Sequence, residues 1–457
     1  MNRDLLRDLY AAVAAALLVV TAAVVGGAVQ HRDGSLRVNW PPLLADWDPH
    51  VGPGTPAAIA VAAAVVAYGP SLAARLSWRR LLLAGWAAGL AWTWSLALVD
   101  GWYRGIAEQL TTRSEYLPVV GRFRDIPATL RDFTGHILID SPDNWPAHVA
   151  GHPPGATLTF VLLDRIGLGG GGWAGTWCIT AGTTAAVAVL VALRALAGEA
   201  LARRAAPFLV LAPAAVWVGT SADGYFAAVA AWALALLALA VTGHRPALTG
   251  AASGLLLGLT AYLSYGLTLI AVIAAAVLVL GTHRTRPLLF AAAGCVVVPA
   301  AFTLVGFDWW EAYRLLVRRY HQGAGGVRPY GYWVWANLAC AAVITGPATA
   351  AGLRRTGIAL AGARGGRDFA GPRGGPALAG PRGGRPEFRL ALLVGAALVA
   401  LLAADLSGMS KAETERIWLP FAMWLLPACA FLTRPRAWLL AQAVLALLVN
   451  HVLRTGW

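Results

Sequence analysis

Charge is scarce in this sequence: only 13% of its 457 residues are charged, while 58% are hydrophobic. Soluble globular proteins carry roughly 25% charged and 45–50% apolar residues. Such a low charge content is too little to keep a chain of this length in water. The composition therefore excludes an ordinary soluble protein and indicates a chain that lies mostly in lipid.

Lysine and cysteine are almost missing as well. Lys411 is the single lysine, so arginine carries nearly all of the net charge of +14. The arginines cluster in short connections between apolar segments, as the positive-inside rule requires of cytoplasmic loops, and they predict no nucleic-acid partner.

The four cysteines lie far apart inside apolar segments and show no metal-ligand spacing. The sequence therefore predicts no metal site, although its many acidic residues would allow a divalent cation to bind.

Apolar segments follow one another along the whole chain. A spanning helix needs roughly 20 apolar residues, and many segments approach or reach that length. The sequence therefore predicts an all-α fold, a polytopic transmembrane helical bundle of about 13 spans. The predicted spans cover residues 10–30, 56–77, 81–99, 172–194, 205–222, 224–242, 247–263, 265–281, 287–305, 332–352, 388–406, 418–433 and 437–454.

The arginine-rich connections lead to a predicted topology. When all of them are cytoplasmic, alternate loops lie outside, and the segment 100–151 is one of these outer loops. Spans counted forward from the N-terminus place the segment 100–151 outside, and spans counted back from the Arg203–Arg204 loop place the start of the span 172–194 outside as well. The apolar stretch 152–168 between them therefore cannot cross; it contains Asp164 and Arg165 and begins with His-Pro-Pro-Gly. We interpret this stretch as a re-entrant or in-plane helix that packs against protein. The alternative is that it crosses and that a hairpin such as 205–242 does not.

Composition divides the chain into four parts. Residues 353–388 are rich in arginine, glycine and proline and contain Gly-Pro-Arg-Gly-Gly twice, which predicts a flexible cytoplasmic linker without a core. This linker separates a transmembrane hairpin (1–80) and a transmembrane core (81–352) from a three-helix C-terminal block (389–457).

The longest outer segment, 100–151, combines acidic residues and histidines with aromatic residues. Structureless loops longer than roughly 12–15 residues are uncommon, and apolar positions at three- and four-residue spacings predict in-plane amphipathic helices at the membrane surface. Asp100 stands at the outer end of a span, where partial desolvation would suit a general base. The alternative is a simple charge at a helix end.

Two later outer segments carry basic residues. In the segment 306–331, Arg314, Arg318 and His321 share one helix face, and an anionic ligand such as a lipid phosphate would explain arginines on the outer side. The alternative is an aromatic belt whose arginines reach toward the headgroups. In the segment 405–418, Arg416 lies closest to the next apolar run, which predicts a buried guanidinium directed at a specific partner.

In their order along the chain, these residues resemble the GT-C class of integral membrane glycosyltransferases. Asp100 matches the acidic residue that follows a span in that family, and His152-Pro153-Pro154-Gly155 matches its motif at re-entry into the membrane. Arg416, ahead of Pro420, matches its late basic position. The resemblance covers roughly residues 81–433.

The resemblance implies transfer of a sugar from a polyprenyl-phosphate donor to a glycan or lipid acceptor of the cell envelope, with inversion, at the outer face of a bacterial plasma membrane. The base would be Asp100 or, because two spans precede the span that ends at Asp100, one of Glu115, Asp46 and Asp48. Basic side chains would bind the donor phosphate: Arg416, Arg314, Arg318 and His152. The residues expected to line the cavity are Trp102, Tyr103, His148, Asp223, Tyr262, Tyr265 and Trp309.

Two other functions stay open from the sequence. One is a transporter or lipid flippase, which would place its binding groups near the middle of the bilayer, whereas the ionisable residues here gather at the predicted outer ends of the helices. The other is a non-catalytic subunit of a cell-envelope assembly complex, for which the aromatic outer loop would be a docking surface.

Overall fold

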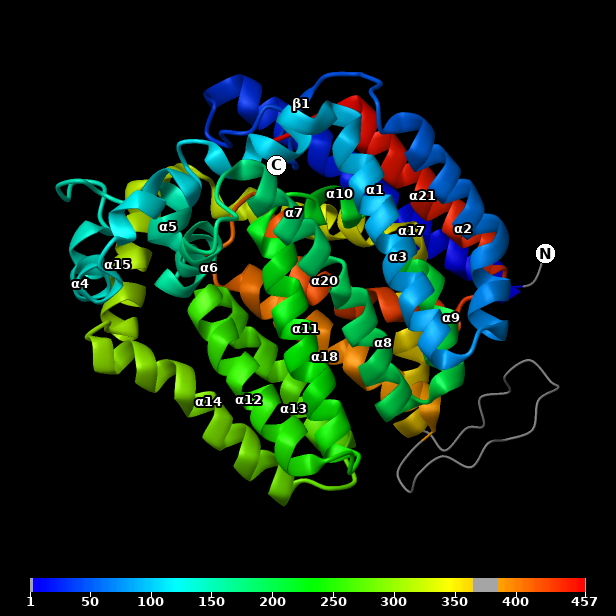
Figure 1. The fold of residues 1–457 in the computed structure, drawn as a ribbon. Coiled ribbons are helices and arrows are strands. Elements are labelled where there is room, and N and C mark those ends of the chain that lie inside the picture. Colours follow the sequence, from blue (N-terminus) through cyan, green and yellow to red (C-terminus); the bar gives the residue numbers. More distant parts are fainter. Residues whose placement is uncertain (1–2, 365–384, 457) are drawn as a thin grey trace.

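The computed structural model describes residues 3–364 and 385–456 as a helical bundle with a cap of short helices at one end (Figure 1). Nine helices in these ranges are long and apolar enough to cross a membrane, or ten when one bent pair counts as one span. The long helices are α1 (Arg3–Asp33), α2 (Thr55–Arg75), α3 (Trp78–Ala97, continued by η1, Leu98–Asp100), α7 with α8 (Gly171–Gly182 and Thr184–Ala197), α11 (Ala222–Val241), α12 (Pro246–Leu263), α14 (Thr285–Val305), α18 (Pro386–Leu406) and α21 (Pro435–Val452). The predicted polytopic all-α fold is confirmed.

Three of the predicted spans form shorter or broken helices, which explains why the count of long helices is below thirteen. Residues 205–222 divide into α9 (Glu199–Val210) and α10 (Ala215–Val218), 265–281 into η6 (Tyr265–Leu269) and α13 (Ile270–Leu280), and 418–433 into α20 (Leu419–Leu425) and η7 (Leu426–Phe431). Prolines account for two of these breaks, because Pro213 follows the end of α9 and Pro427 begins η7 within its first two positions.

The bent pair lies in α17 (Tyr330–Arg364), where the axis turns by 107° between Thr345 and Pro347. Gly346 has φ of 78°, a conformation that only glycine adopts readily, and Pro347 cannot continue the backbone hydrogen bonding. Gln442 of α21 pairs with the exposed backbone groups: its Nε2 donates to Thr345 O at 2.7 Å, and its Oε1 accepts from Ala348 N at 3.3 Å. The bend is therefore held from a neighbouring helix.

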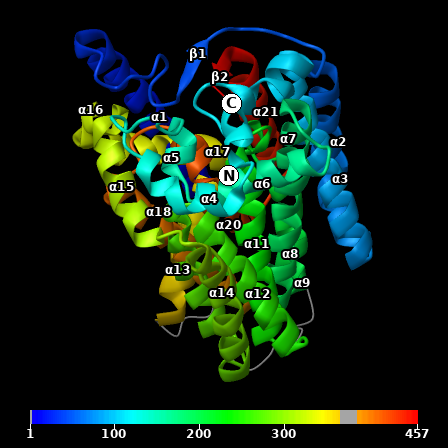
Figure 2. The same ribbon diagram turned by 60° about the vertical axis from the view of Figure 1, so that its left-hand side comes forward.

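One end of the bundle, here called the loop end, collects the non-spanning segments (Figure 2). It carries a two-stranded antiparallel sheet of β1 (Ala45–Trp47) and β2 (Leu453–Thr455). It also carries α15 (Trp309–Gln322), α16 (Ala324–Val327) and α19 (Thr414–Ile417). The segment 100–151 is a chain of short helices at this end: η2 (Tyr103–Ala107), η3 (Gln109–Thr111), η4 (Leu117–Phe123), α4 (Ile126–Asp132), η5 (Phe133–His136) and α5 (Ala147–Gly151).

The apolar stretch 152–168 contains the short helix α6, Pro154–Arg165, of 12 residues. At a rise of 1.5 Å per residue this helix is about 18 Å long, which is less than the roughly 30 Å of a hydrocarbon core. Its length agrees with the interpretation that it does not cross.

The segment predicted as a linker is described only in part. Residues 353–364 are the helical end of α17, so this portion is ordered where a flexible linker was expected. Residues 365–384, which hold both Gly-Pro-Arg-Gly-Gly repeats, lie outside the described residues. The division of the chain at 80, 352 and 388 stays a prediction.

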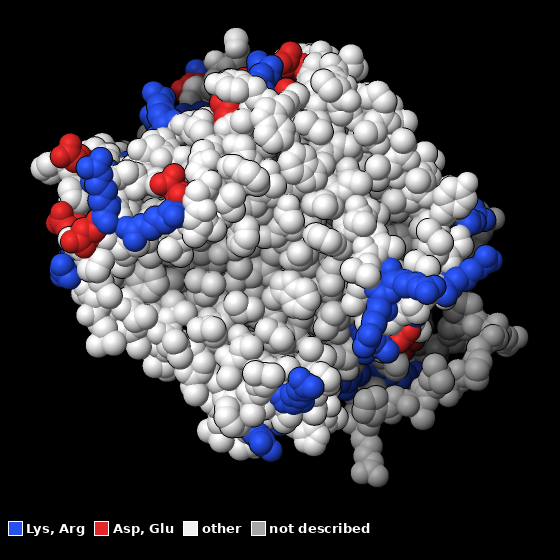
Figure 3. Space-filling model, in the orientation of Figure 1, with Lys and Arg blue, Asp and Glu red and all other residues white. Residues whose placement is uncertain are grey.

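Charges occupy the two ends of the molecule. Figure 3 shows acidic and basic side chains together at the loop end, mostly basic ones toward the opposite end, and a broad band of uncharged surface between them. This is the distribution expected of a bundle that crosses a membrane.

At the end opposite the loop end, α1 is tied to α17 by a buried carboxylate. Asp8 is fully buried and pairs with Arg354 at 2.5 Å and Arg355 at 2.5 Å. Replacing Asp8 by Ala leaves two arginines without this partner, so we expect the free energy of unfolding to fall by about 3–5 kcal/mol. Thermal denaturation of the purified protein in detergent measures the loss.

Asp4 is the matched control for this variant. It lies one turn away, its side chain is 54% exposed, and it pairs with the same Arg354 at 3.6 Å. Asp4→Ala is expected to cost less than about 1 kcal/mol, as exposed ion pairs do. Equal losses in the two variants would contradict the role assigned to the buried pair.

Candidate active site

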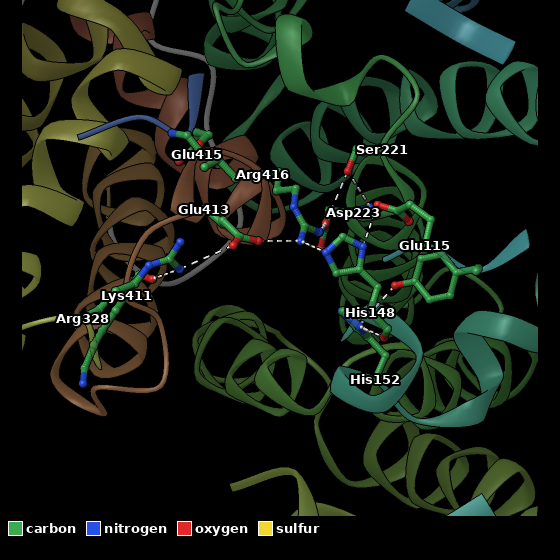
Figure 4. A network of polar contacts seen from close by, with 12 residues as sticks. Glu115, His148, His152, Ser221, Asp223, Arg328, Lys411, Glu413, Glu415 and Arg416 are labelled. Atoms are coloured by element: carbon green, nitrogen blue, oxygen red, sulfur yellow. Dashed lines mark hydrogen bonds and ion pairs between the residues drawn. The ribbon is translucent and has the colours of Figure 1, made fainter. Parts of the chain in front are cut away.

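Arg416 lies at the centre of a buried network of charged and polar side chains at the loop end (Figure 4). It belongs to the short helix α19, and its side chain is only 6% exposed. The residues before this helix, Ala412 and Glu413, have φ of 70° and 62°. Non-glycine residues held in this left-handed region cost of order 1–3 kcal/mol each and cluster at functional sites. The backbone is thus strained at the point where it delivers the guanidinium.

Three side chains from three parts of the chain accept hydrogen bonds from Arg416. Nη1 donates to Asp223 Oδ2 at 2.5 Å, while Nη2 donates to His148 Nε2 at 2.8 Å and to Glu413 Oε2 at 3.0 Å. A buried charge without partners would cost several kcal/mol. The guanidinium therefore determines how α11, α5 and α19 meet.

Asp223 is placed by the start of α11. Ser221 caps this helix, its Oγ accepting from Asp223 N at 3.2 Å. A carboxylate in the first turn is stabilised by the positive end of the helix dipole. The sequence Ser-Ala-Asp before a long apolar run thus fixes a buried negative charge opposite Arg416.

The contacts of His148 fix its tautomer. A guanidinium can only donate, so His148 Nε2, which receives the hydrogen bond from Arg416, carries no proton. The ring proton is then on Nδ1, which lies 2.6 Å from Glu115 Oε1. The imidazole thus lies between the Glu115 carboxylate and the guanidinium.

The backbone supports the same link. His148 N donates to Ser114 O at 2.9 Å, which joins α5 to the turn that carries Glu115. Glu115 is itself buried, with a side chain only 9% exposed. Both ends of the contact between Glu115 and His148 are therefore fixed.

His152 lies behind this network. Its Nδ1 donates to His148 O at 2.7 Å and lies 3.2 Å from Tyr116 Oη. Burial lowers the pKa of His152 to about 4, so the imidazole is neutral at neutral pH. His152 thus supports α5 and brings no positive charge to the site.

Arg328 extends the network on the side of Glu413. It is buried, and its Nη1 donates to Lys411 O at 2.8 Å and contacts Glu413 Oε1 at 3.5 Å. Its Nε donates to Leu36 O at 3.1 Å, which brings in the connection after α1. Arg328 was not among the residues predicted from the sequence, although its position just before a span is the same signal that singled out Arg416.

Asp100, the first predicted base, has other partners. It ends η1, its side chain is one quarter exposed, and it pairs with Arg104 at 3.3 Å and with His50 at 3.5 Å. The adjacent Trp102 and Tyr103 are mostly exposed. The carboxylate that the structure brings to Arg416 through a histidine is instead the alternative one, Glu115.

The aromatic residues predicted to line a cavity lie beside α15. Tyr262 and Trp309 border a cavity of about 620 Å³ between α12, α14 and α15, and Tyr265 packs against Trp309 with ring centroids 5.0 Å apart. Arg314 and Arg318 are exposed on α15. Neither arginine is buried in the way that Arg416 is.

The described part of the network does not contain a group of side chains arranged to bind a cation. Among the residues that the structure describes, no group of three or more His, Cys, Asp or Glu side chains is arranged to hold a metal ion. Asp223 and Glu413 are both engaged by Arg416. We therefore derive no step through a metal.

Comparisons with known proteins add a likeness of structure. No protein-family model matches this sequence, and no curated protein sequence matches it. A crystal structure of the Archaeoglobus fulgidus oligosaccharyltransferase in complex with Zn and sulfate is similar with a TM-score of 0.47 and 15% identity, covering 81% of this chain and 53% of that chain. The same oligosaccharyltransferase, tethered to an acceptor peptide that contains the NVT sequon, gives a TM-score of 0.41 and 14% identity, covering 76% and 49%.

The chain thus spans about half the length of the archaeal protein that it resembles. At this degree of likeness, the function has to be argued from the residues of the site itself.

Glu415, next to Arg416, gives a prediction about pH. Its side chain is completely buried, Oε1 accepts from Leu44 N at 2.9 Å, and Oε2 has no hydrogen-bond partner among the described residues. Burial raises the pKa of Glu415 to about 7, from 4.5. Between these two values the folded protein keeps a proton that the unfolded chain has released, so stability falls as the pH rises through this window.

We expect Glu415→Gln to remove that loss, because the amide stays neutral and can still accept from Leu44. At pH 8 the variant should be more stable than the parent by roughly 1–3 kcal/mol, and at pH 4.5 nearly equal to it. Thermal denaturation across this pH range measures the difference. Glu311→Gln, at an exposed position, is the control; parallel pH profiles for the parent and Glu415→Gln would refute the assignment.

Proposed function

We propose that this chain is a membrane glycosyltransferase that moves a sugar from a polyprenyl-phosphate donor to a glycan or lipid acceptor. The observation that carries the proposal is the buried chain of contacts from Glu115 through His148 to Arg416. It joins a carboxylate that can accept a proton to a guanidinium that can stabilise a developing phosphate charge.

The position of this network supports an active face on the outer side of the membrane. The arginines of the short connections gather at the end opposite the loop end, which the positive-inside rule assigns to the cytoplasm. The loop end then faces outward, and a lipid-linked sugar would meet the network at the membrane surface. In a bacterium this corresponds to the outer face of the plasma membrane.

The proposed reaction is a single displacement. Glu115 takes the proton of an acceptor hydroxyl, and the oxygen forms a bond to the anomeric carbon of the sugar. The bond from that carbon to the phosphate oxygen breaks, and the bonding pair leaves with the lipid phosphate. One base and no second carboxylate acting as a nucleophile correspond to inversion at the anomeric carbon.

Arginines would stabilise the leaving phosphate. Arg416 would give up its contact with Glu413 and bind the phosphate instead. Glu413 is the more exposed of its two carboxylate partners, because its side chain is 24% exposed and that of Asp223 is 4% exposed. Arg314 and Arg318 on α15 would add positive charge from the surface. His148 would hold the carboxylate of Glu115 in place through its Nδ1 proton.

Glu115→Gln tests the proposal against the other predicted base. The amide cannot accept the proton, so we expect transfer from polyprenyl-phosphate sugars to fall by about 10²–10⁴-fold, measured with radiolabelled donors in membranes that contain the protein. Asp100→Asn is the matched control, because it removes a carboxylate whose partners are His50 and Arg104.

Asp100→Asn is expected to retain most of the activity. Loss of transfer in Asp100→Asn with retention in Glu115→Gln would assign the base to Asp100. Full transfer activity in both variants would contradict the assignment of the base to either residue. Transport of the lipid-linked sugar by the parent protein without any transfer would reject the glycosyltransferase in favour of a flippase.

A further inference from the structure

A second cavity lies beside the network, between η4, α6 and the start of α7. Its volume is about 340 Å³. Its walls are mainly apolar: Leu117, Pro118, Phe160, Leu163, Leu168 and Ala174. An apolar cavity of about 150 Å³ is enough to bind benzene, so this one has room for several carbons of an alkyl chain.

The cavity adjoins the proposed base across a pair of aromatic rings. Phe160 lines the cavity and stacks on Tyr116 with ring centroids 5.3 Å apart. Tyr116 follows Glu115 in the chain, and both border the small pocket that contains Arg416. An apolar group in the cavity is therefore separated from Glu115, which would deprotonate the acceptor, by the stacked rings of Phe160 and Tyr116.

The cavity and the Arg416 pocket are both bordered by polar side chains of one short helix. The 3₁₀ helix η3 contributes Thr111 to the cavity and Gln109 to the pocket. Asp164 adds an exposed carboxylate at the end of α6. A molecule with an apolar tail and a polar head would thus find a site for each part on the two sides of η3.

We infer that the acceptor is an amphiphile, whose apolar tail occupies the cavity between η4, α6 and α7 while its sugar or hydroxyl headgroup reaches Glu115 over η3. This inference rests on the proposed function and names its acceptor class.

Photolabelling tests the inference without relying on turnover. The protein in lipid nanodiscs is irradiated with octyl glucoside that carries a diazirine at the end of its alkyl chain, and the labelled peptides are identified by mass spectrometry. We expect label on residues 158–174 that exceeds the label on α14, which is largely exposed along its apolar face. The ratio of the two labels corrects for partition of the probe into the bilayer.

Two variants that fill the cavity are expected to lower this ratio at least tenfold. Leu168→Trp acts at a partly exposed wall position, and Ala174→Phe acts at a buried one, so a folding defect in the second leaves the first informative. Leu289→Trp on α14, at a position 66% exposed, is the matched control and should leave the ratio unchanged. An unchanged ratio in folded Leu168→Trp would overturn the inference.

Competition separates the acceptor from the donor. A polyprenyl phosphate added in excess should leave the label in the cavity intact; displacement would assign the cavity to the donor chain and overturn the acceptor assignment. Failure of the proposed function gives a different result from failure of this inference. If the cavity is labelled but the protein has no transferase activity, the cavity binds an amphiphile that is not the acceptor of this reaction.

Discussion

The buried guanidinium of Arg416 is the constraint on which the loop end depends. A charge removed from water is tolerated only where hydrogen-bond acceptors surround it, and two of the three acceptors here are remote from Arg416 in the sequence. Asp223 starts α11, His148 belongs to α5, and Glu413 immediately precedes α19. Arg328 repeats the pattern by joining Glu413 to the segment after α1. These ion pairs act together with the buried apolar side chains of the segment 100–151, which belong to the main core, to hold the short helices over the bundle.

The same contacts determine the chemistry. Arg416 donates to Nε2 of His148, so the histidine cannot take a proton there from a substrate without losing the guanidinium, while its Nδ1 lies 2.6 Å from Glu115 Oε1. In the proposed reaction the proton would therefore go to the Glu115 carboxylate. Counting the ions gives two arginines, Arg328 and Arg416, against three carboxylates, Glu115, Asp223 and Glu413. In the proposed reaction, a donor phosphate would displace a carboxylate from Arg416 and would gain from the additional arginines on α15.

The sequence predicts the helical bundle and the burial of Arg416 because both follow from local pattern: runs of apolar residues, and a basic residue directly before one of them. The partners of Asp100, which are His50 and Arg104, could not be predicted in this way, because proximity to a span end does not say which side chains a carboxylate meets. The contact of His148 with Glu115 depends on how 100–151 folds as successive short helices, tied by His148 N to Ser114 O, and no period in the sequence encodes that path. The lengths of the shorter helices could not be predicted for a similar reason. The segments 265–281 and 418–433 are apolar enough to resemble spans, but each changes from one helix type to another, at the boundary of η6 with α13 and of α20 with η7.

The pocket bordered by Glu115, Tyr116, Ser221 and Arg416 has a volume of only about 10 Å³, which is about the space that one water needs. A sugar hydroxyl cannot enter it while all contacts are kept. The elements on its border differ in how firmly they are held: Asp223 is anchored by the cap of a 20-residue helix, whereas Gln109 lies on a single turn of 3₁₀ helix. Short helices carry few internal hydrogen bonds and open at a lower free energy than the long helices below them. In the proposed reaction, the side of the pocket formed by η3 is therefore the side expected to yield to a substrate, and η3 also borders the apolar cavity.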